Sequence, residues 1–254
     1  MLKFFKTWTL PISMLAGAIG YFVFANVTFL EPTKPFMYTL IAYLTPFLIF
    51  AQLLLTFCKI SVRELMPSPW RGWLLLIQAV SSLVLAALLL WLPMREEYRD
   101  VFEGAMVCLI CPTATAAAVI TGKLGGSASS LTTYTLLSNL LAAIVVPLVF
   151  PLVEPHAEIT FFAAFLKILG KVFPLLLFPF FLALFLRRFI PPIHRFLAGL
   201  RDMAFYLWAV ALAIVTGQTV KSLVNSEAEI YVEILIALGG LITYIAQFYW
   251  GCLL

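Results

Sequence analysis

Residues 101–119 read Val101-Phe-Glu-Gly-Ala-Met-Val-Cys-Leu-Ile-Cys-Pro-Thr-Ala-Thr-Ala-Ala-Ala-Val119, an apolar run with a proline near its middle. Pro112 has no backbone N–H to donate, and its ring disfavours the helical conformation at Cys111. The side chains from Thr113 to Ala118 are all small, so neighbouring helices can approach closely. The residues alone allow two interpretations. One is a proline kink in a packed membrane helix, and the other is a helix broken at mid-membrane, as in many transporter binding sites.

The composition of the chain places this stretch in a membrane protein. Hydrophobic residues make up 63% of the 254 residues, charged residues make up 11%, and the mean hydropathy is +1.07. A soluble domain usually carries a charge at about a quarter of its positions, so lipid must be the solvent for most of this chain. No polar stretch is long enough for a second domain. The sequence therefore predicts a single transmembrane domain, residues 1–254, in a lipid bilayer.

Apolar segments of about 20 residues, the length that crosses a bilayer, recur between short polar stretches. They predict an all-α membrane protein with about eight transmembrane helices. The first segment is too long for the apolar part of a secretory signal peptide, and residues 187–202 are expected to form a polar loop. The segments lie near residues 8–30, 36–57, 72–92, 101–122, 127–150, 164–186, 203–224 and 231–250.

Lysine and arginine residues set the expected orientation of these segments. Most of them fall on one side of the predicted membrane, for example Lys3, Lys59 and the arginines of residues 187–201. Cytoplasmic loops are enriched in these residues, so both termini of this integral, multi-pass membrane protein are predicted to be cytoplasmic, in the inner membrane if the protein is bacterial. The net charge of +4 is spread singly and in pairs, which indicates no nucleic-acid partner.

The cysteines and histidines give little support to an enzyme. The cysteines, all in or beside apolar segments, are Cys58, Cys108, Cys111 and Cys252. The C-x-x-C pair at 108 and 111 lacks the second pair or nearby histidine of a zinc site. His156 and His194 lie in predicted loops, and the sequence contains neither H-E-x-x-H nor G-x-S-x-G. We expect no catalytic residues, no cofactor and no resident metal.

Polar residues inside two other apolar segments are candidates for a binding site. Thr135 and Asn139 are four residues apart and therefore share a helix face, with Ser138 beside them, and Gln78 lies within the third segment. Buried at this depth, such groups need partners. They can hydrogen-bond between helices, or their oxygens can bind a small hard cation. Both interpretations remain open on the residues alone.

These residues resemble the pattern of a known transporter family. Cys111-Pro-Thr-Ala-Thr-Ala-Ala-Ala-Val119, with Thr135-x-x-Ser138-Asn139-Leu-Leu and Pro147, resembles the C-P-G-G-T-A-S-N-V … T-x-x-S-T-L-L … P pattern of the bile acid:sodium symporter family. Gln52-Leu-Leu-Leu-Thr-Phe57 and Gln78 resemble the second and third helices of that family. The resemblance covers residues 46–150 well and the remainder only by hydropathy.

The resemblance implies a secondary active transporter, with Na⁺-coupled symport of an organic anion such as a bile acid or a smaller carboxylate. Members have two inverted repeats, a panel domain and a core domain, in which helices broken at mid-membrane cross beside the Na⁺ sites. Here residues 8–57 and 164–224 would be panel-like, and residues 72–150 and 231–250 core-like. By position, the candidate cation ligands are Gln78, Thr115, Thr135 and Asn139, and the candidate substrate and crossover residues are Cys111, Pro112, Thr113 and Ser138.

Two departures from the family pattern bear on function. Ala117 and Ala118 replace a serine and an asparagine, so two oxygen ligands are missing, and Asn139 stands where the family has a threonine. The sequence also stops after the eighth segment, so we expect a partial inverted-repeat fold in a truncated chain, and both an active and an inactive transporter are compatible with it. A non-transporting membrane sensor or assembly component is therefore an alternative function. An intramembrane enzyme is a less favoured one, and the oligomeric state is left open.

Overall fold

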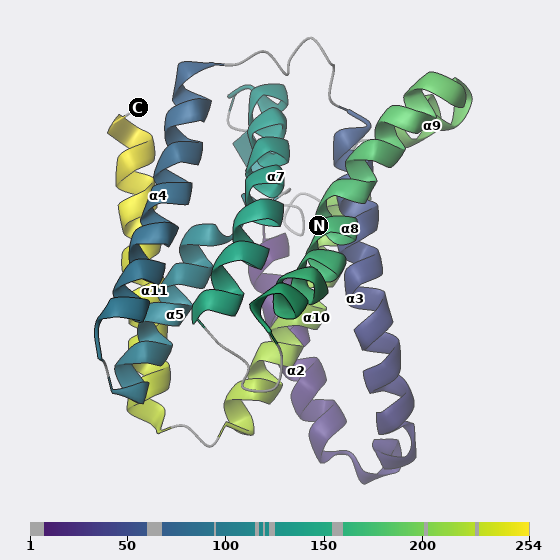
Figure 1. Cartoon of the computed structure of the whole chain (residues 1–254). Coiled ribbons are helices and arrows are strands. Elements are labelled where there is room, and N and C mark those ends of the chain that lie inside the picture. The colour runs from purple at the N-terminus through teal and green to yellow at the C-terminus, as the bar shows by residue number, and fades with distance from the viewer. Residues whose placement is uncertain are drawn as a thin grey trace. The chain divides into compact units, whose positions relative to one another are not determined.

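The computed structural model describes residues 8–59, 68–93, 95–114, 117–118, 120–121, 125–153, 160–200, 203–226 and 229–253 (Figure 1). Within these ranges all regular structure is helical, and seven helices are long and apolar enough to cross a membrane. The all-α membrane fold is thereby confirmed. The helices are α2 (Thr9–Asn26), η1 (Thr28–Thr33), α3 (Lys34–Phe57), α4 (Pro69–Trp91), α5 (Glu96–Ile110), α7 (Ala128–Val153), α8 (Phe161–Phe189), α9 (Pro191–Gly199), α10 (Met203–Val224) and α11 (Ile230–Leu253).

The fourth predicted segment, residues 101–122, is not one continuous span. α5 begins at Glu96 and ends at Ile110, and Cys111 takes a φ of −52° and a ψ of 127°. This extended backbone is the conformation that the ring of a following proline enforces. The structure therefore confirms a broken fourth helix.

A short helix replaces part of the loop predicted at residues 187–202. α9 starts with Pro191 and Pro192, and proline suits the first turn because its fixed φ is helical and its missing N–H has no partner there. The apolar side chains of Ile193 and Phe196 are exposed. An amphipathic helix of this kind is typical of a segment lying along a membrane surface.

The chain forms two compact units, each made of separate stretches. Unit 1 comprises Met1–Lys59, Thr115–Gly126 and Pro179–Glu227, and unit 2 comprises Ile60–Ala114, Ser127–Phe178 and Ala228–Leu254. The boundary at residue 179 falls inside α8, so this helix contributes to both. The panel-like and core-like grouping of the helices, and their inverted repeat, stay predictions.

Unit 1 is organised around the close crossing of α2 and α10, and α10 also packs against α3. A Cβ atom placed on Gly17 would lie 2.1 Å from the carbonyl oxygen of Ala213, and one on Gly217 would lie 3.0 Å from the carbonyl oxygen of Gly17. Real Cβ atoms do not approach backbone so closely. Small residues are thus required where these two backbones meet, a common solution for packing helices in membranes.

Unit 2 places the broken helix among three others. α5 packs against α4 and α11, and α7 packs against α4. Arg99 pairs with Glu103 one turn along α5 at 2.8 Å, and its guanidinium also donates to the carbonyl of Val153 at the end of α7. The buried core consists of Ala86, Leu89, Met106, Ile110, Ala142, Val145, Val149 and Val153.

Candidate functional site

The end of α5 lies inside the membrane rather than at its surface. The helix has 15 residues, and at 1.5 Å per residue it is about 22 Å long. Its first turn carries the charged residues Glu96, Glu97 and Arg99. The hydrocarbon core of a bilayer is about 30 Å thick, so a helix that starts at the interface with charged residues ends before it has crossed. The carbonyls at its C-terminus then lie at a depth without bulk water, where they need partners.

Gln78 of α4 supplies those partners. Its Nε2 donates to the carbonyl of Ile110 at 2.9 Å and reaches the carbonyl of Cys111 at 3.5 Å. A glutamine inside an otherwise apolar helix is thus explained by the broken end of its neighbour. Gln78 and Cys111, predicted separately from the sequence as site residues, thus lie together in the structure.

Ser138 of α7 connects Gln78 to the other side of the break. Its hydroxyl donates to Oε1 of Gln78 at 3.1 Å and accepts the backbone N–H of Thr113 at 3.4 Å. Ser138 is only 1% exposed. We call Gln78, Ser138, Thr113 and the carbonyls of Ile110 and Cys111 the Gln78–Ser138 network.

Thr135 and Asn139 are both buried on α7, but their hydrogen bonds stay within that helix. The Thr135 hydroxyl donates to the carbonyl of Leu131 at 3.0 Å, and the Asn139 amide donates to the carbonyl of Thr135 at 2.7 Å. Whether either residue binds a cation stays a prediction.

The remaining predicted site residues are less informative. Pro112 is half-buried and lies in the sequence between Cys111, whose carbonyl Gln78 reaches, and Thr113. Thr115 lies outside the described residues. Beside Gln78, a crevice lined by residues of α4, α5 and α7 is too small to admit a water molecule. In this conformation the network is therefore closed, with its polar atoms bonded to one another.

The structure also reveals a buried cation in unit 2 that the sequence analysis counted only toward orientation. Arg71, near the start of α4, is 9% exposed and donates to the hydroxyl of Ser130 at 2.8 Å. It lies over the ring of Trp70, which in turn packs against Tyr134. The adjacent Trp70-Arg71 pair was the available signal, because arginine often stacks on aromatic rings.

No cluster of three or more metal-binding side chains occurs in the part of the chain that the structure describes. Cys108 and Cys111 are free thiols there, as is the buried Cys58. Burial raises the pKa of the Cys58 thiol, which follows the end of α3, to about 11. This thiol therefore stays protonated and poorly reactive at neutral pH.

A profile of the Sodium Bile acid symporter family matches residues 45–226, which is more than half of the chain. The chain belongs to the sodium bile acid symporter family. No curated protein and no solved structure matches it. The family match starts within α3, ends just after α10 and includes the whole Gln78–Ser138 network. It confirms the resemblance seen in residues 46–150 and extends it toward the C-terminus.

Membership in the sodium bile acid symporter family, together with seven apolar helices in the described residues, makes this chain an integral, multi-pass membrane protein of a transporter family. The family name specifies sodium-coupled transport in general terms.

Proposed function

We propose that this protein is a secondary active transporter that couples the entry of Na⁺ to the movement of an organic anion. The observation that carries the proposal is the interruption of α5 at Cys111-Pro112, at membrane depth, with its end bound by Gln78. Irregular backbone at this depth is tolerated only where protein or a water-filled cavity satisfies it. Secondary transporters place their ion and substrate sites at such interruptions.

The chemistry of the network is suited to a small hard cation. The Gln78 side chain joins the oxygens of the network. Its amide nitrogen donates to the carbonyls of Ile110 and Cys111, and its Oε1 accepts from the hydroxyl of Ser138. Amide, hydroxyl and carbonyl oxygens are the ligands that hard cations prefer. In the observed conformation the Gln78 amide nitrogen holds the two carbonyls. Na⁺ binding there requires Gln78 to turn and present its oxygen.

The resemblance to the family and the argument of charge balance support an anionic substrate. An anion that moves together with Na⁺ offsets the charge of the ion, which lowers the cost of bringing either through a low-dielectric region. Bile acids and smaller carboxylates both have this chemistry. The two classes differ in size, so transport assays with one member of each separate them.

Uptake into proteoliposomes tests the proposal. The purified chain is reconstituted, and uptake of radiolabelled cholate and pyruvate is measured with an inward Na⁺ gradient and with an equal K⁺ gradient. We expect Na⁺-dependent uptake of one of them, and loss of most of it in Gln78→Leu. Ser82→Ala, which removes an equally buried hydroxyl bonded to its own helix at Ala79, should keep uptake.

Two outcomes would contradict the proposal. Equal uptake in Na⁺ and K⁺ would remove Na⁺ coupling, and unchanged uptake in Gln78→Leu would remove the network from the ion path. Absence of uptake of either probe, together with absence of Na⁺-specific thermal stabilisation, would instead favour the non-transporting sensor or assembly component. That alternative has one observation behind it, because Ala117 and Ala118 offer no oxygen where the family pattern has two.

We further propose that both termini lie in the cytoplasm, from the lysine and arginine distribution. In a cysteine-free background, single cysteines are placed at Ser68, His194 and Glu154, the last of which lies outside the described residues. An impermeant maleimide added outside intact cells should label the cysteine at 154 and not the other two. Labelling at position 68 from outside would reverse the orientation.

A further inference from the structure

Unit 1 contains a cavity of about 500 Å³ that the proposed transport site does not use. It is partly open and is lined by α2, α3 and α10, each of which is long and apolar enough to cross a membrane. Its size falls within the range of about 300–1,000 Å³ typical of small-molecule sites. The lining residues are Ala16, Gly17, Gly20, Tyr21, Phe24, Met37, Tyr38, Ile41, Ala42, Ala213, Ile214, Gly217, Gln218 and Lys221.

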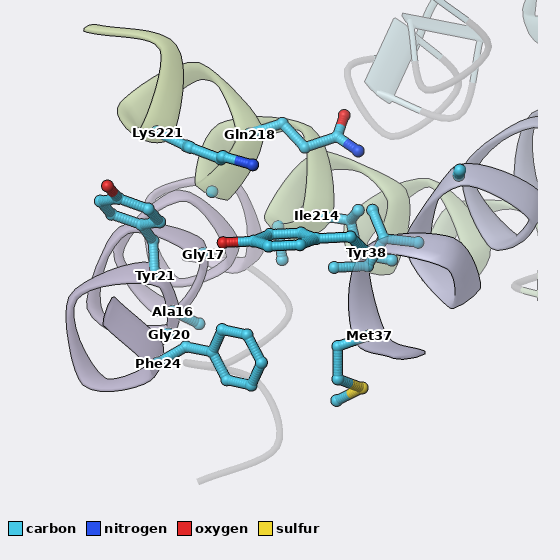
Figure 2. A pocket seen from close by; sticks show the side chains of 14 residues that line it. Ala16, Gly17, Gly20, Tyr21, Phe24, Met37, Tyr38, Ile214, Gln218 and Lys221 are labelled. Atoms are coloured by element: carbon cyan, nitrogen blue, oxygen red, sulfur yellow. The ribbon is translucent and has the colours of Figure 1, made fainter. Parts of the chain in front are cut away.

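The cavity exists because small residues hold α2 and α10 together at one level and leave space at the next. Gly17 and Gly217 fix the close crossing described above. One turn from Gly17, a Cβ placed on Gly20 would meet nothing within 4 Å. Gly17 therefore permits the contact between α2 and α10, whereas Gly20 leaves open space beside α2. Figure 2 shows Gly20, Phe24 and Met37 around the apolar part of the space.

One end of the cavity is polar and cationic. Lys221 lies in the last turn of α10, and its amine is 3.6 Å from the centre of the Tyr38 ring. Figure 2 shows Lys221 and the Gln218 amide on the same side of the cavity. Among the residues that the structure describes, no carboxylate forms an ion pair with Lys221. A lysine in the last turn of a membrane helix lies at the level of lipid headgroups.

The cavity then runs from this interfacial cation toward the membrane interior. The lining residues of α10 extend from Lys221 back to Ala213, which at 1.5 Å per residue is a depth of about 12 Å. The deep end is lined by alanine and isoleucine side chains. An elongated apolar space with one cation at its headgroup end is complementary to a molecule with an apolar chain and a single anionic head.

We propose that this cavity is a binding site for an anionic, single-chain amphiphile supplied by the bilayer, with its head against Lys221 and Gln218 and its chain beside Gly20. The shared chemistry fits a free fatty acid or one chain of an anionic phospholipid, and the experiment distinguishes these sources. The Lys221 cation and the Gln218 amide donor would attract the anionic head at the edge of a low-dielectric space. The proposed transport network belongs to unit 2 and is not involved.

The test uses the full chain in nanodiscs of a zwitterionic lipid and a diazirine-bearing stearate as probe. After illumination, mass spectrometry maps the labelled peptides. We expect saturable labelling of α2, α3 and α10 that unlabelled stearate prevents and octadecanol, which lacks the charge, does not. Competition by phosphatidylglycerol at least as strong as that by stearate would identify a phospholipid as the source, and weaker competition a fatty acid.

Matched variants localise the site. Gly20→Leu fills the cavity and should abolish the labelling, whereas Gly170→Leu, also at a helical glycine with open space around it, should not. Lys221→Gln should weaken stearate at least about tenfold. Lys34→Gln, whose lysine pairs with Glu31 at 3.7 Å, should leave the affinity unchanged.

Several results would overturn the proposal. Equal competition by octadecanol, or an unchanged affinity in Lys221→Gln, would show that the charge does not bind the head. Labelling that survives Gly20→Leu, or that never appears in these helices, would remove the cavity as the site. A change in oligomeric state in Gly20→Leu, measured by light scattering, would assign the space to a second copy of the chain. If Gly20→Leu fails to fold, the two lysine variants still decide the outcome.

Discussion

Replacing Ser138 with alanine tests whether the Gln78–Ser138 network holds the broken helix. The substitution removes one hydroxyl at a position 1% exposed, and with it the bonds to Gln78 and to the backbone N–H of Thr113. Interhelical hydrogen bonds in membranes contribute about 0.6 kcal/mol on average. A buried polar group left without a partner costs about 1–3 kcal/mol. We expect the free energy of unfolding to fall by about 1–3 kcal/mol.

The matched control is Ser82→Ala. Ser82 is also 1% exposed, but its hydroxyl donates to Ala79 one turn back in its own helix, so we expect a loss below about 0.5 kcal/mol. Unfolding in mixed micelles with increasing SDS, followed by tryptophan fluorescence, gives both values. Adding Gln78→Leu to Ser138→Ala completes a double-mutant cycle, with an expected coupling of about 1 kcal/mol. Equal losses for the two serine variants, or a coupling near zero, would refute the network.

Three further predictions concern the break, the helix crossing and the surface helix. If the break opens to water during transport, a cysteine at Thr113 should react with a water-soluble maleimide, whereas one at Leu90, an exposed residue of the apolar helix α4, should not. Equal negligible rates would indicate a packed kink. Gly17→Ala should destabilise by about 1–3 kcal/mol through its clash with the α10 backbone, while Gly20→Ala should be neutral or stabilising, as thermal unfolding would measure. Burial, and secondarily the charge of Arg187, lower the pKa of His194. As the pH falls, His194 is therefore protonated in the unfolded state before it is protonated in the folded state. The free energy of unfolding should then decrease slightly below about pH 6.5. His194→Gln should remove that decrease.

The elements that the sequence predicts well are those determined by neighbouring residues. Apolar length is a property of each segment by itself, and seven of the segments are confirmed as helices able to span a membrane. The break at Cys111 is likewise local, because Pro112 acts on the residue just before it. α9 was missed because its charged and histidine residues resemble a loop, although Pro191 at its start was a usable signal.

The contacts that build the sites depend on packing between distant segments. Gln78 and Ser138 are 60 residues apart, and periodicity within either helix does not reveal that they meet. The same holds for Gly20 and Lys221, which lie in different helices of unit 1. Composition identifies each residue as unusual for its surroundings, but only the fold says which of them face each other.

The hydrogen bonds of α7 have a consequence for how easily that helix can move. Thr132, Thr133, Thr135 and Asn139 each donate to a carbonyl four residues earlier in α7 itself. A sliding or rotating helix carries such bonds with it, so these donors are not left unpaired. Ser138 differs, because its bonds cross to other segments and must break when α7 shifts. Polar resistance to such a displacement therefore comes from bonds that cross to other segments, which include those of Ser138 and those that Ser130 and the Val153 carbonyl accept from Arg71 and Arg99.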